Sequence, residues 1–404
     1  MTHTEQKLKQ SLRLGIILLI FIVLAFPDPR GRSLYAYNET LRDLGVTQSI
    51  AHGHLALLGP VSSLGNFHFG PAYYYLLYPF AKITNFALWS LPLASVFYGC
   101  LFILLIFFVV KKWWQNFEMA YLAAALAATS TLTVQFAKYA SNPNFIPLFC
   151  LLFFYSLERL VGGTAKRYWQ TFLLALSFGV AIQLHAVPLI CLPVILIALF
   201  VSNRLKFSPA QWALFLAVIL ATNGMYIFYE ITHNFENLKS LAHIGAGANI
   251  YAPFSEHFIQ YLGFWVSSII SVNPFFNIPL ILGIPFYTFF VMVLILFYAV
   301  FKYNHARLKP AAVKPQTQPS VKLVIKYWLI VPSLILLLPL GALAGLRIYY
   351  FFILSPLVFI LLALGLWRLL YRGYGILVYY LLVVYFIMQA GQMYVYYQLV
   401  SQLR

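Results

Sequence analysis

The sequence is poor in acidic residues and in charge of either sign. It has 9 Asp and Glu among 404 residues, and charged residues make up 9% of the chain, whereas soluble globular domains carry about 25%. Hydrophobic residues make up 62% and aromatic residues 18%, and the mean hydropathy is +0.84. These values exclude a soluble globular domain and predict an all-α polytopic membrane protein that forms one helical bundle.

Dense basic tracts and paired cysteines are also missing. The net charge is +17, but Lys and Arg are scattered at the ends of apolar runs, which is typical of membrane topology signals and excludes a nucleic-acid partner. Cys100, Cys150 and Cys191 lie far apart inside apolar runs. They support neither a disulfide framework nor a metal knuckle.

Long apolar runs define the predicted architecture, because about 17 to 25 such residues cross the hydrocarbon layer as a helix. The first run has no small-residue cleavage site after it, so we expect a retained helix and not a signal peptide. We interpret the shorter runs 72–87 and 258–275 as interfacial or partly inserted segments. Eleven transmembrane helices are predicted near 12–27, 88–110, 117–137, 143–161, 169–185, 187–202, 211–230, 280–302, 326–345, 349–371 and 375–397.

The distribution of basic residues predicts a cytoplasmic N-terminus. With that orientation, eighteen of the 26 Lys and Arg residues lie at the inner face. Six acidic residues and most histidines then fall at or beyond the outer face. We therefore expect the chemistry on the non-cytoplasmic side.

Two outer segments are long enough to carry function, residues 28–71 as a catalytic loop and 231–257 as a substrate-facing loop. In "SLYAYNETLRDLGVTQSIAHG" the apolar spacing predicts an interfacial helix with Ser33 as its N-cap. Glu39 and Asp43, at i and i+4, share one face of it. The Pro- and Lys-rich stretch 303–325 is interpreted as a cytoplasmic linker.

Several motifs in order along the chain resemble one enzyme family. They are "HGHLALLGPVSSLGNFHFGPAYYYLLYPF", "YASNPNFIPLFCLLFFYSLERL", "LSFGVAIQLHAVPLICLPV", "YEITHNFENLKSL" and "RIYYFFILSPLVF". Together they are similar to the GT-C superfamily of polyprenyl-phosphate-sugar-dependent glycosyltransferases, specifically bacterial proteins similar to protein O-mannosyltransferases and the aminoarabinose lipid A transferase. The resemblance spans most of residues 12–371.

The resemblance implies an inverting transferase at the outer face of a bacterial inner or plasma membrane. Such an enzyme moves a sugar from a polyprenyl-phosphate donor to an acceptor hydroxyl on a glycan, lipid or protein. In relatives, an acidic residue early in the first outer loop is the general base, within a motif like Asp-Gln-Gly-Arg-Asp. "ETLRD" matches it with Glu39, Arg42 and Asp43 and departs at Thr40 and Leu41.

Elementary chemistry agrees with a single base. A carboxylate takes the proton of the attacking hydroxyl, and a phosphate leaving group needs cations and no general acid. We assign Glu39 and Asp43 as catalytic candidates, with Arg42 as a substrate-binding one. The alternative is that the two carboxylates only solvate an interfacial helix, or that one of them pairs with Arg42.

Two basic residues on the outer side are candidates for the donor phosphate. Arg347 lies in the short outer turn "GLRIYYF", and Lys138 ends the third predicted span. The fork of an Arg side chain suits phosphate. Snorkelling towards the headgroups is the alternative for both residues.

Other polar residues of the matched motifs are candidates for substrate binding. Asn142 alternatively caps a helix that begins with Pro143, and His185 alternatively serves only as a helix-end residue. The candidates are His68, Tyr74, Asn142, Asn144, Gln183, His185, His233 and Tyr349.

The sequence gives little support for a metal. His52 and His54 beside Glu39 or Asp43 make a divalent cation an option, but H-x-H without a third fixed ligand is weak, so no tightly bound cofactor is expected. Two other functions are kept as alternatives. A lipid-linked sugar flippase or transporter would favour repeated halves with a midplane site, and an O-antigen-type polymerase would favour an arginine-rich late loop.

Overall fold

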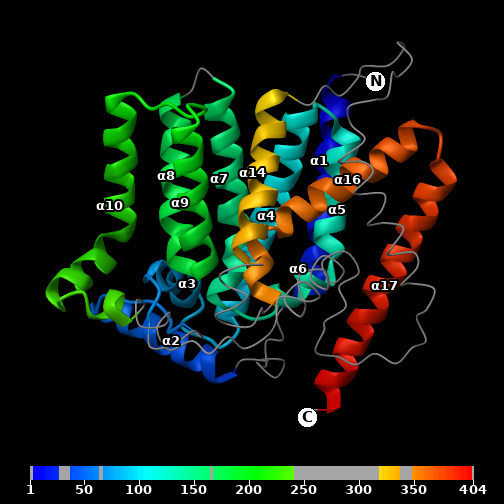
Figure 1. The fold of residues 1–404 in the computed structure, drawn as a ribbon. Helices are drawn as coiled ribbons and strands as arrows, with labels where there is room; N and C mark the ends of the chain where they lie inside the picture. Colours follow the sequence, from blue (N-terminus) through cyan, green and yellow to red (C-terminus); the bar gives the residue numbers. More distant parts are fainter. Residues whose placement is uncertain are drawn as a thin grey trace, which may run out of the picture.

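The computed structural model describes residues 3–26, 37–62, 67–163, 167–240, 318–336 and 348–402. These ranges are helical apart from their connections and one short antiparallel pairing. Most of the long helices run roughly side by side in one bundle (Figure 1). Their bounds are α1 His3–Ala25, α4 Ser90–Trp114, α5 Phe117–Thr129, α6 Thr131–Ala137, η1 Asn142–Phe145, α7 Ile146–Val161, α8 Arg167–Leu184, α9 Ala186–Val201, α10 Pro209–Thr232, α14 Pro319–Ile335, η4 Ile348–Ile353, α16 Ser355–Tyr371 and α17 Gly375–Gln402.

The predicted helical bundle is confirmed, and ten of the eleven predicted spans overlap these helices. By length and composition, four described helices are apolar enough to cross a membrane: the Leu8–Ala25 part of α1, α4, η1 with α7, and α10. The span near 280–302 and the end of that near 326–345 lie outside the described residues. The count of eleven and the cytoplasmic N-terminus stay predictions.

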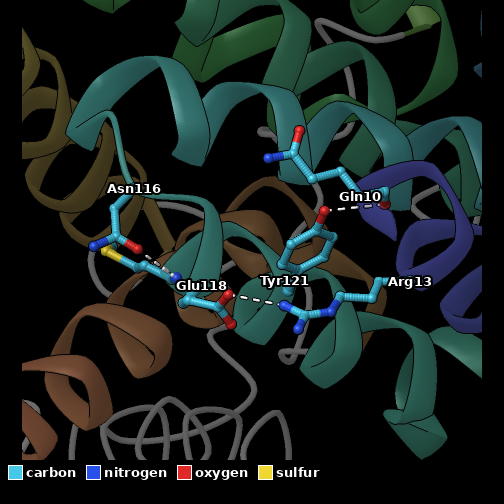
Figure 2. A network of polar contacts seen from close by, with 6 residues as sticks. Gln10, Arg13, Asn116, Glu118 and Tyr121 are labelled. Carbon is cyan, nitrogen blue, oxygen red and sulfur yellow. Dashed lines mark hydrogen bonds and ion pairs between the residues drawn. The ribbon is translucent and has the colours of Figure 1, made fainter. Parts of the chain in front are cut away.

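Polar contacts join α1 to the start of α5 (Figure 2). The guanidinium of Arg13 donates to Glu118 Oε1 at 2.9 Å, and Tyr121 donates its hydroxyl hydrogen to the carbonyl of Gln10 at 3.0 Å. Asn116 caps α5 by accepting from Met119 N at 2.8 Å. The exposed ion pair contributes at most about 1 kcal/mol, so packing of the apolar faces of these helices provides most of the stabilisation.

The predicted span 117–137 is not one continuous helix. It bends by 54° between α5 and α6, because Ser130 adopts an extended backbone at that point. The break leaves the amide of Thr131 without a helical acceptor, and α17 supplies one, since Gln389 Oε1 accepts from Thr131 N at 2.7 Å. Tyr385 of α17 also donates at 2.8 Å to Leu126 O, which already accepts from Ser130 N at 3.1 Å. Satisfying such groups from a neighbouring helix is what makes a broken helix tolerable at membrane depth.

Helix α14 holds the short helix η4 in place. The indole of Trp328 stacks on Phe154 of α7 with ring centroids 4.1 Å apart, and its Nε1 donates to the carbonyl of Ile353 at 2.7 Å. At the other end of α14, the buried carboxylate of Glu158 accepts from Ser320 and Trp113. The position of η4 therefore depends on α7 through α14.

Two further helices, α2 Tyr37–Ala51 and α3 Ala72–Ile83, lie at the end of the bundle opposite the start of α1 (Figure 1). The predicted helix in the first outer loop is thus present, although Ser33, its expected N-cap, lies outside the described residues. Helix α3 has 12 residues and contains Pro79, so it is too short to span a bilayer. This agrees with the interfacial interpretation of 72–87, whereas 258–275 lies outside the described residues.

We expect Gln389→Leu to destabilise the protein by about 1–3 kcal/mol, because it leaves the buried amide of Thr131 without an acceptor. The measurement is thermal unfolding of the purified protein in detergent. Gln6→Leu, at an exposed position of α1, is the matched control and should unfold at the wild-type temperature. Equal stability of both variants would show that the α17 contact does not support the break.

Candidate functional site

A cavity of about 320 Å³ opens where the ends of several helices meet α2. Volumes near this size are usual for ligand sites. Seven residues predicted from the sequence gather around it, and aromatic and small residues complete the wall. The lining residues are Glu39, Arg42, Asp43, Pro60, Val61, Phe69, Phe136, Tyr139, Ser141, Asn142, Pro143, Asn144, His185 and Tyr349.

The two carboxylates of α2 occupy different environments. The side chain of Asp43 is 1% exposed. Its Oδ1 accepts a hydrogen bond from Arg42 Nε at 2.8 Å and forms an ion pair with Arg42 Nη2 at 2.8 Å, and its Oδ2 accepts from the Tyr73 hydroxyl at 2.9 Å. Glu39 is exposed and lines the cavity. Among the described residues it has no hydrogen-bond or ion-pair partner. Asp43 therefore anchors α2 to α3, and Glu39 is the carboxylate available to a ligand.

Burial dominates the electrostatics around Asp43. It raises the pKa of the Asp43 carboxyl above its ordinary value, although the charge of Arg42 and the bonds from Arg42 and Tyr73 oppose the shift. Burial and the nearby Asp43 also raise the pKa of the Tyr74 hydroxyl. Tyr74 is itself buried and is not among the cavity-lining residues. Burial also raises the pKa of the Tyr73 hydroxyl, so both tyrosines stay protonated, and Tyr73 acts as a hydrogen-bond donor.

Residues 59–62 and 67–70 pair in a short hairpin that contributes Pro60, Val61 and Phe69 to the cavity wall. Its strands approach closely, and a Cβ on Gly59 would lie 2.1 Å from the carbonyl oxygen of Gly70. Only glycine fits at that position. This close approach explains the glycine of "LLGP", whereas a Cβ on Gly70 of "HFGP" would collide with the side chain of Gln183.

His68, predicted to bind substrate, holds the hairpin through its backbone and does not line the cavity. Its backbone N–H donates to Asn237 Oδ1 at 2.6 Å, and its carbonyl accepts from Asn237 Nδ2 at 3.0 Å. The buried carboxylate of Glu230 accepts from Asn237 Nδ2 at 3.0 Å and fixes this amide. The described part of segment 231–257, up to residue 240, thus holds the hairpin of segment 28–71 in place. Sequence reasoning missed Asn237, since an isolated Asn carries no motif.

Gln183 and His233 also lie outside the cavity lining. Gln183 Nε2 donates to the carbonyls of Gly179 and Thr222 at 2.9 and 2.8 Å, and its Oε1 accepts from Ala72 N at 3.1 Å. These bonds join α8, α10 and α3. His233 ends α10 at an exposed position, with its ring stacked on Tyr229 at 4.0 Å. Both side chains have structural contacts that account for their positions.

Of the two candidates for phosphate, Lys138 does not line the cavity, and Arg347 lies outside the described residues. Lys138 is 5% exposed and follows α6 as its C-cap. Tyr349, a near neighbour of Arg347 in the sequence, lines the cavity. Arg42 is the described cation in the wall, and Asp43 already binds it. The phosphate roles of Arg347 and Lys138 stay predictions.

The asparagines of "SNPNF" line the cavity in a way that differs from the predicted cap. Asn142 lies inside η1, whose N-cap is Ser141, so the alternative that Asn142 caps this helix is wrong. Its Nδ2 donates instead to the carbonyl of Leu184 at the end of α8. Asn144 Nδ2 donates to the carbonyls of Phe136 and Tyr139 at 2.7 and 2.8 Å. Both amides hold the backbone around the break between α6 and α7.

His185 lies between α8 and α9 and is 4% exposed. It is the N-cap of α9, since its Nδ1 accepts from Val187 N at 3.3 Å. Aromatic rings surround it: Phe69 is stacked at 5.6 Å, and Tyr349 and Tyr350 lie at 5.4 and 5.0 Å. Phe69, Phe136 and Tyr139 of the wall were missed from sequence, because single aromatic residues are frequent throughout this chain.

A metal site does not emerge in the part of the chain that the structure describes. There, no three His, Cys, Asp or Glu side chains lie close enough to hold an ion. His52 and His54 are exposed and do not line the cavity. The expectation of no tightly bound cofactor stays a prediction.

Comparison with known proteins identifies the fold. A family model described as dolichyl-phosphate-mannose-protein mannosyltransferase (PMT_2) matches residues 68–235, less than half of the chain. ArnT from Cupriavidus metallidurans, bound to undecaprenyl phosphate, has a TM-score of 0.59 at 15% identity, with 93% of this chain and 62% of ArnT covered. The chain has a GT-C fold. The predicted resemblance to these polyprenyl-phosphate-dependent glycosyltransferases is thereby confirmed.

A second GT-C structure supports the same assignment. It is the archaeal oligosaccharyltransferase AglB from Archaeoglobus fulgidus, in complex with an inhibitory peptide and a dolichol-phosphate, with a TM-score of 0.55, 14% identity and coverage of 96% of this chain and 56% of AglB. The chain thus spans less than two thirds of either GT-C structure. No curated protein matches the sequence. At such identities the similarity establishes the fold alone.

The different environments of the two carboxylates predict different effects on stability. Asp43→Leu removes the acceptor of Arg42 and of the buried Tyr73 hydroxyl, and should cost about 1–3 kcal/mol. Glu39→Gln, at an exposed position, should change stability by less than about 0.5 kcal/mol. Thermal unfolding of both variants in the same detergent tests this. A larger loss in the Glu39 variant would contradict the anchoring role of Asp43.

Proposed function

We propose that this GT-C protein is an inverting glycosyltransferase that moves a sugar from a polyprenyl-phosphate donor to an acceptor hydroxyl. The observation that carries the proposal is the exposed Glu39 carboxylate, which lines a cavity that also contains asparagine, histidine and aromatic side chains. The polyprenyl phosphates bound to ArnT and AglB support the donor class. We further propose that the reaction takes place at the periplasmic face of a bacterial inner membrane.

The proposed step needs one base. Glu39 takes the proton of the acceptor hydroxyl while the oxygen of that hydroxyl bonds to the anomeric carbon of the donor sugar. The bond from that carbon to the phosphate oxygen breaks, and its electron pair leaves with polyprenyl phosphate. Attack from the face opposite the phosphate inverts the anomeric centre. Because the phosphate leaves as a stable anion, no general acid is required.

Asp43 is proposed to act as a positioning residue and not as the base. Asp43 binds Arg42 and Tyr73, and these contacts hold α2 in place with Glu39 one turn away. Arg42, fixed by Asp43, lines the cavity. This role agrees with the alternative, considered from sequence, that one carboxylate pairs with Arg42.

We expect Glu39→Gln to lower the rate of sugar transfer by about 100- to 10,000-fold, the usual contribution of a general base. Asp43→Asn keeps a hydrogen-bonding side chain and should lower the transfer rate by much less. The measurement is transfer of labelled sugar from a polyprenyl-phosphate donor in proteoliposomes. A near-normal transfer rate in the Glu39 variant would show that Glu39 is not the general base. Donor crossing the bilayer without a glycosidic product would favour the flippase alternative.

Donor binding provides a separate test of the phosphate assignment. Arg347→Ala should weaken binding of undecaprenyl phosphate by about tenfold or more, because a charge-assisted hydrogen bond contributes about 1.5–3 kcal/mol. Lys239→Ala, in the other outer segment, is the control and should bind as wild type. Unchanged affinity in the Arg347 variant would indicate that Arg347 serves as a membrane-surface anchor.

A further inference from the structure

The helix cap made by His185 determines where its proton lies. The backbone of His185 is extended, with φ −166°, and Nδ1 accepts the N–H of Val187. A ring nitrogen that accepts a hydrogen bond carries no hydrogen, so the proton of the neutral ring is on Nε2. Nε2 lies on the opposite edge of the ring from the capping bond. The cap therefore makes His185 a hydrogen-bond donor of fixed orientation.

No described residue accepts from this donor. His185 lines the cavity, and the rings of Phe69, Tyr349 and Tyr350 pack beside its ring. A donor without a protein acceptor, held in an aromatic enclosure beside a cavity, suits an oxygen atom of a ligand.

Asn144 provides a complementary acceptor in the same wall. Both hydrogens of its amide nitrogen are committed, one to the carbonyl of Phe136 and one to that of Tyr139. This orients the side chain, and its Oδ1 is buried without a hydrogen-bond partner in the described part of the chain. A buried acceptor of this kind costs free energy until a donor reaches it. A hydroxyl group can supply that donor, whereas an ionised phosphate cannot.

The charges of the cavity separate two regions of its wall. Among the described residues, the charged ones that line the cavity all come from α2, namely Glu39, Arg42 and Asp43. The described residues of the wall around His185 and Asn144 carry no charge. An uncharged polar ring with one apolar face matches that wall better than a phosphate does.

We propose that His185 and Asn144 form the sugar subsite of this cavity, in which His185 Nε2 donates to one sugar oxygen and Asn144 Oδ1 accepts from a sugar hydroxyl. The apolar face of the sugar packs on the rings of Phe69 and Tyr349. This inference rests on the proposed function and adds the side chains that select the sugar. His185 thus has two roles, as the cap of α9 through Nδ1 and as a ligand donor through Nε2.

Two substitutions separate these roles. His185→Asn keeps a good N-cap residue but lacks the donor at the reach of Nε2. His185→Gln places an amide N–H near the position of Nε2 but is a poor N-cap. The probes are undecaprenyl phosphate and the same lipid phosphate carrying mannose, glucose, galactose or arabinose, bound to the purified full chain in nanodiscs. We define the sugar increment as the ratio of affinity for a sugar-carrying lipid to that for undecaprenyl phosphate.

The wild-type protein should show a sugar increment for at least one of the four sugars. His185→Asn should lower that increment by about 5- to 20-fold, the equivalent of one or two lost hydrogen bonds, with undecaprenyl phosphate affinity and melting temperature unchanged. His185→Gln should keep most of the increment and melt at a lower temperature. This opposite pattern in the two variants is not expected from a residue that only caps a helix.

Three results would overturn the subsite. They are no sugar increment in the wild type, an unchanged increment in His185→Asn, or an equal loss of affinity for undecaprenyl phosphate, which would assign His185 to the phosphate. The outcome is independent of transfer. An increment that depends on His185 in a protein that transfers sugar to no acceptor would reject the proposed function and retain the subsite.

Discussion

Side-chain amides hold the backbone wherever helices break at the cavity end of the bundle. Gln389 binds the first amide of α6, Asn144 binds carbonyls at its end, and Asn142 binds the end of α8. Gln183 and Asn237 do the same for α3 and for the hairpin. Each of these bonds satisfies a backbone group that no helix can satisfy, a requirement that is strict at membrane depth. The cavity exists because the helix ends around it are secured in this way.

The same requirement divides the polar side chains into two groups. Gln183, Asn237 and Asp43 use their polar atoms on other parts of the protein, so little of them remains for a ligand. Oδ1 of Asn144 is buried without such a partner in the part of the chain that the structure describes, and Glu39 and His185 line the same cavity. Residue type alone does not separate the groups, because both contain carboxylates and amides. Hydrogen-bond partners separate them, and partners require coordinates.

Much of the fold followed from the sequence, since apolar length and the positions of Lys and Arg dictate where helices cross a bilayer. The helix that carries Glu39 and Asp43 was also predicted from apolar spacing. The break at Ser130 was not, because "ATSTL" contains neither Pro nor Gly. Its partner, Gln389, lies 258 residues away in sequence, and no local pattern indicates a contact of that range.

The candidate site was predicted in part. The family-like motifs led to seven residues that line one cavity, but they equally suggested His68, Gln183 and His233, which bind protein groups instead. The different burial of Glu39 and Asp43 was out of reach, since both occupy the same helix one turn apart. Only the position of Tyr73 on α3 shows which carboxylate is enclosed.

The bond between Thr131 and Gln389 also bears on the order of assembly. A chain is made from its N-terminus, and early helices insert before later ones exist. Helix α6 therefore lacks its partner until α17 has been synthesised and has docked. Until then the wall that carries Phe136, Tyr139 and the two asparagines has one unsecured end. The ligand cavity is thus among the last parts of the molecule to mature, and a nascent chain without α17 is an incomplete receptor for its substrates.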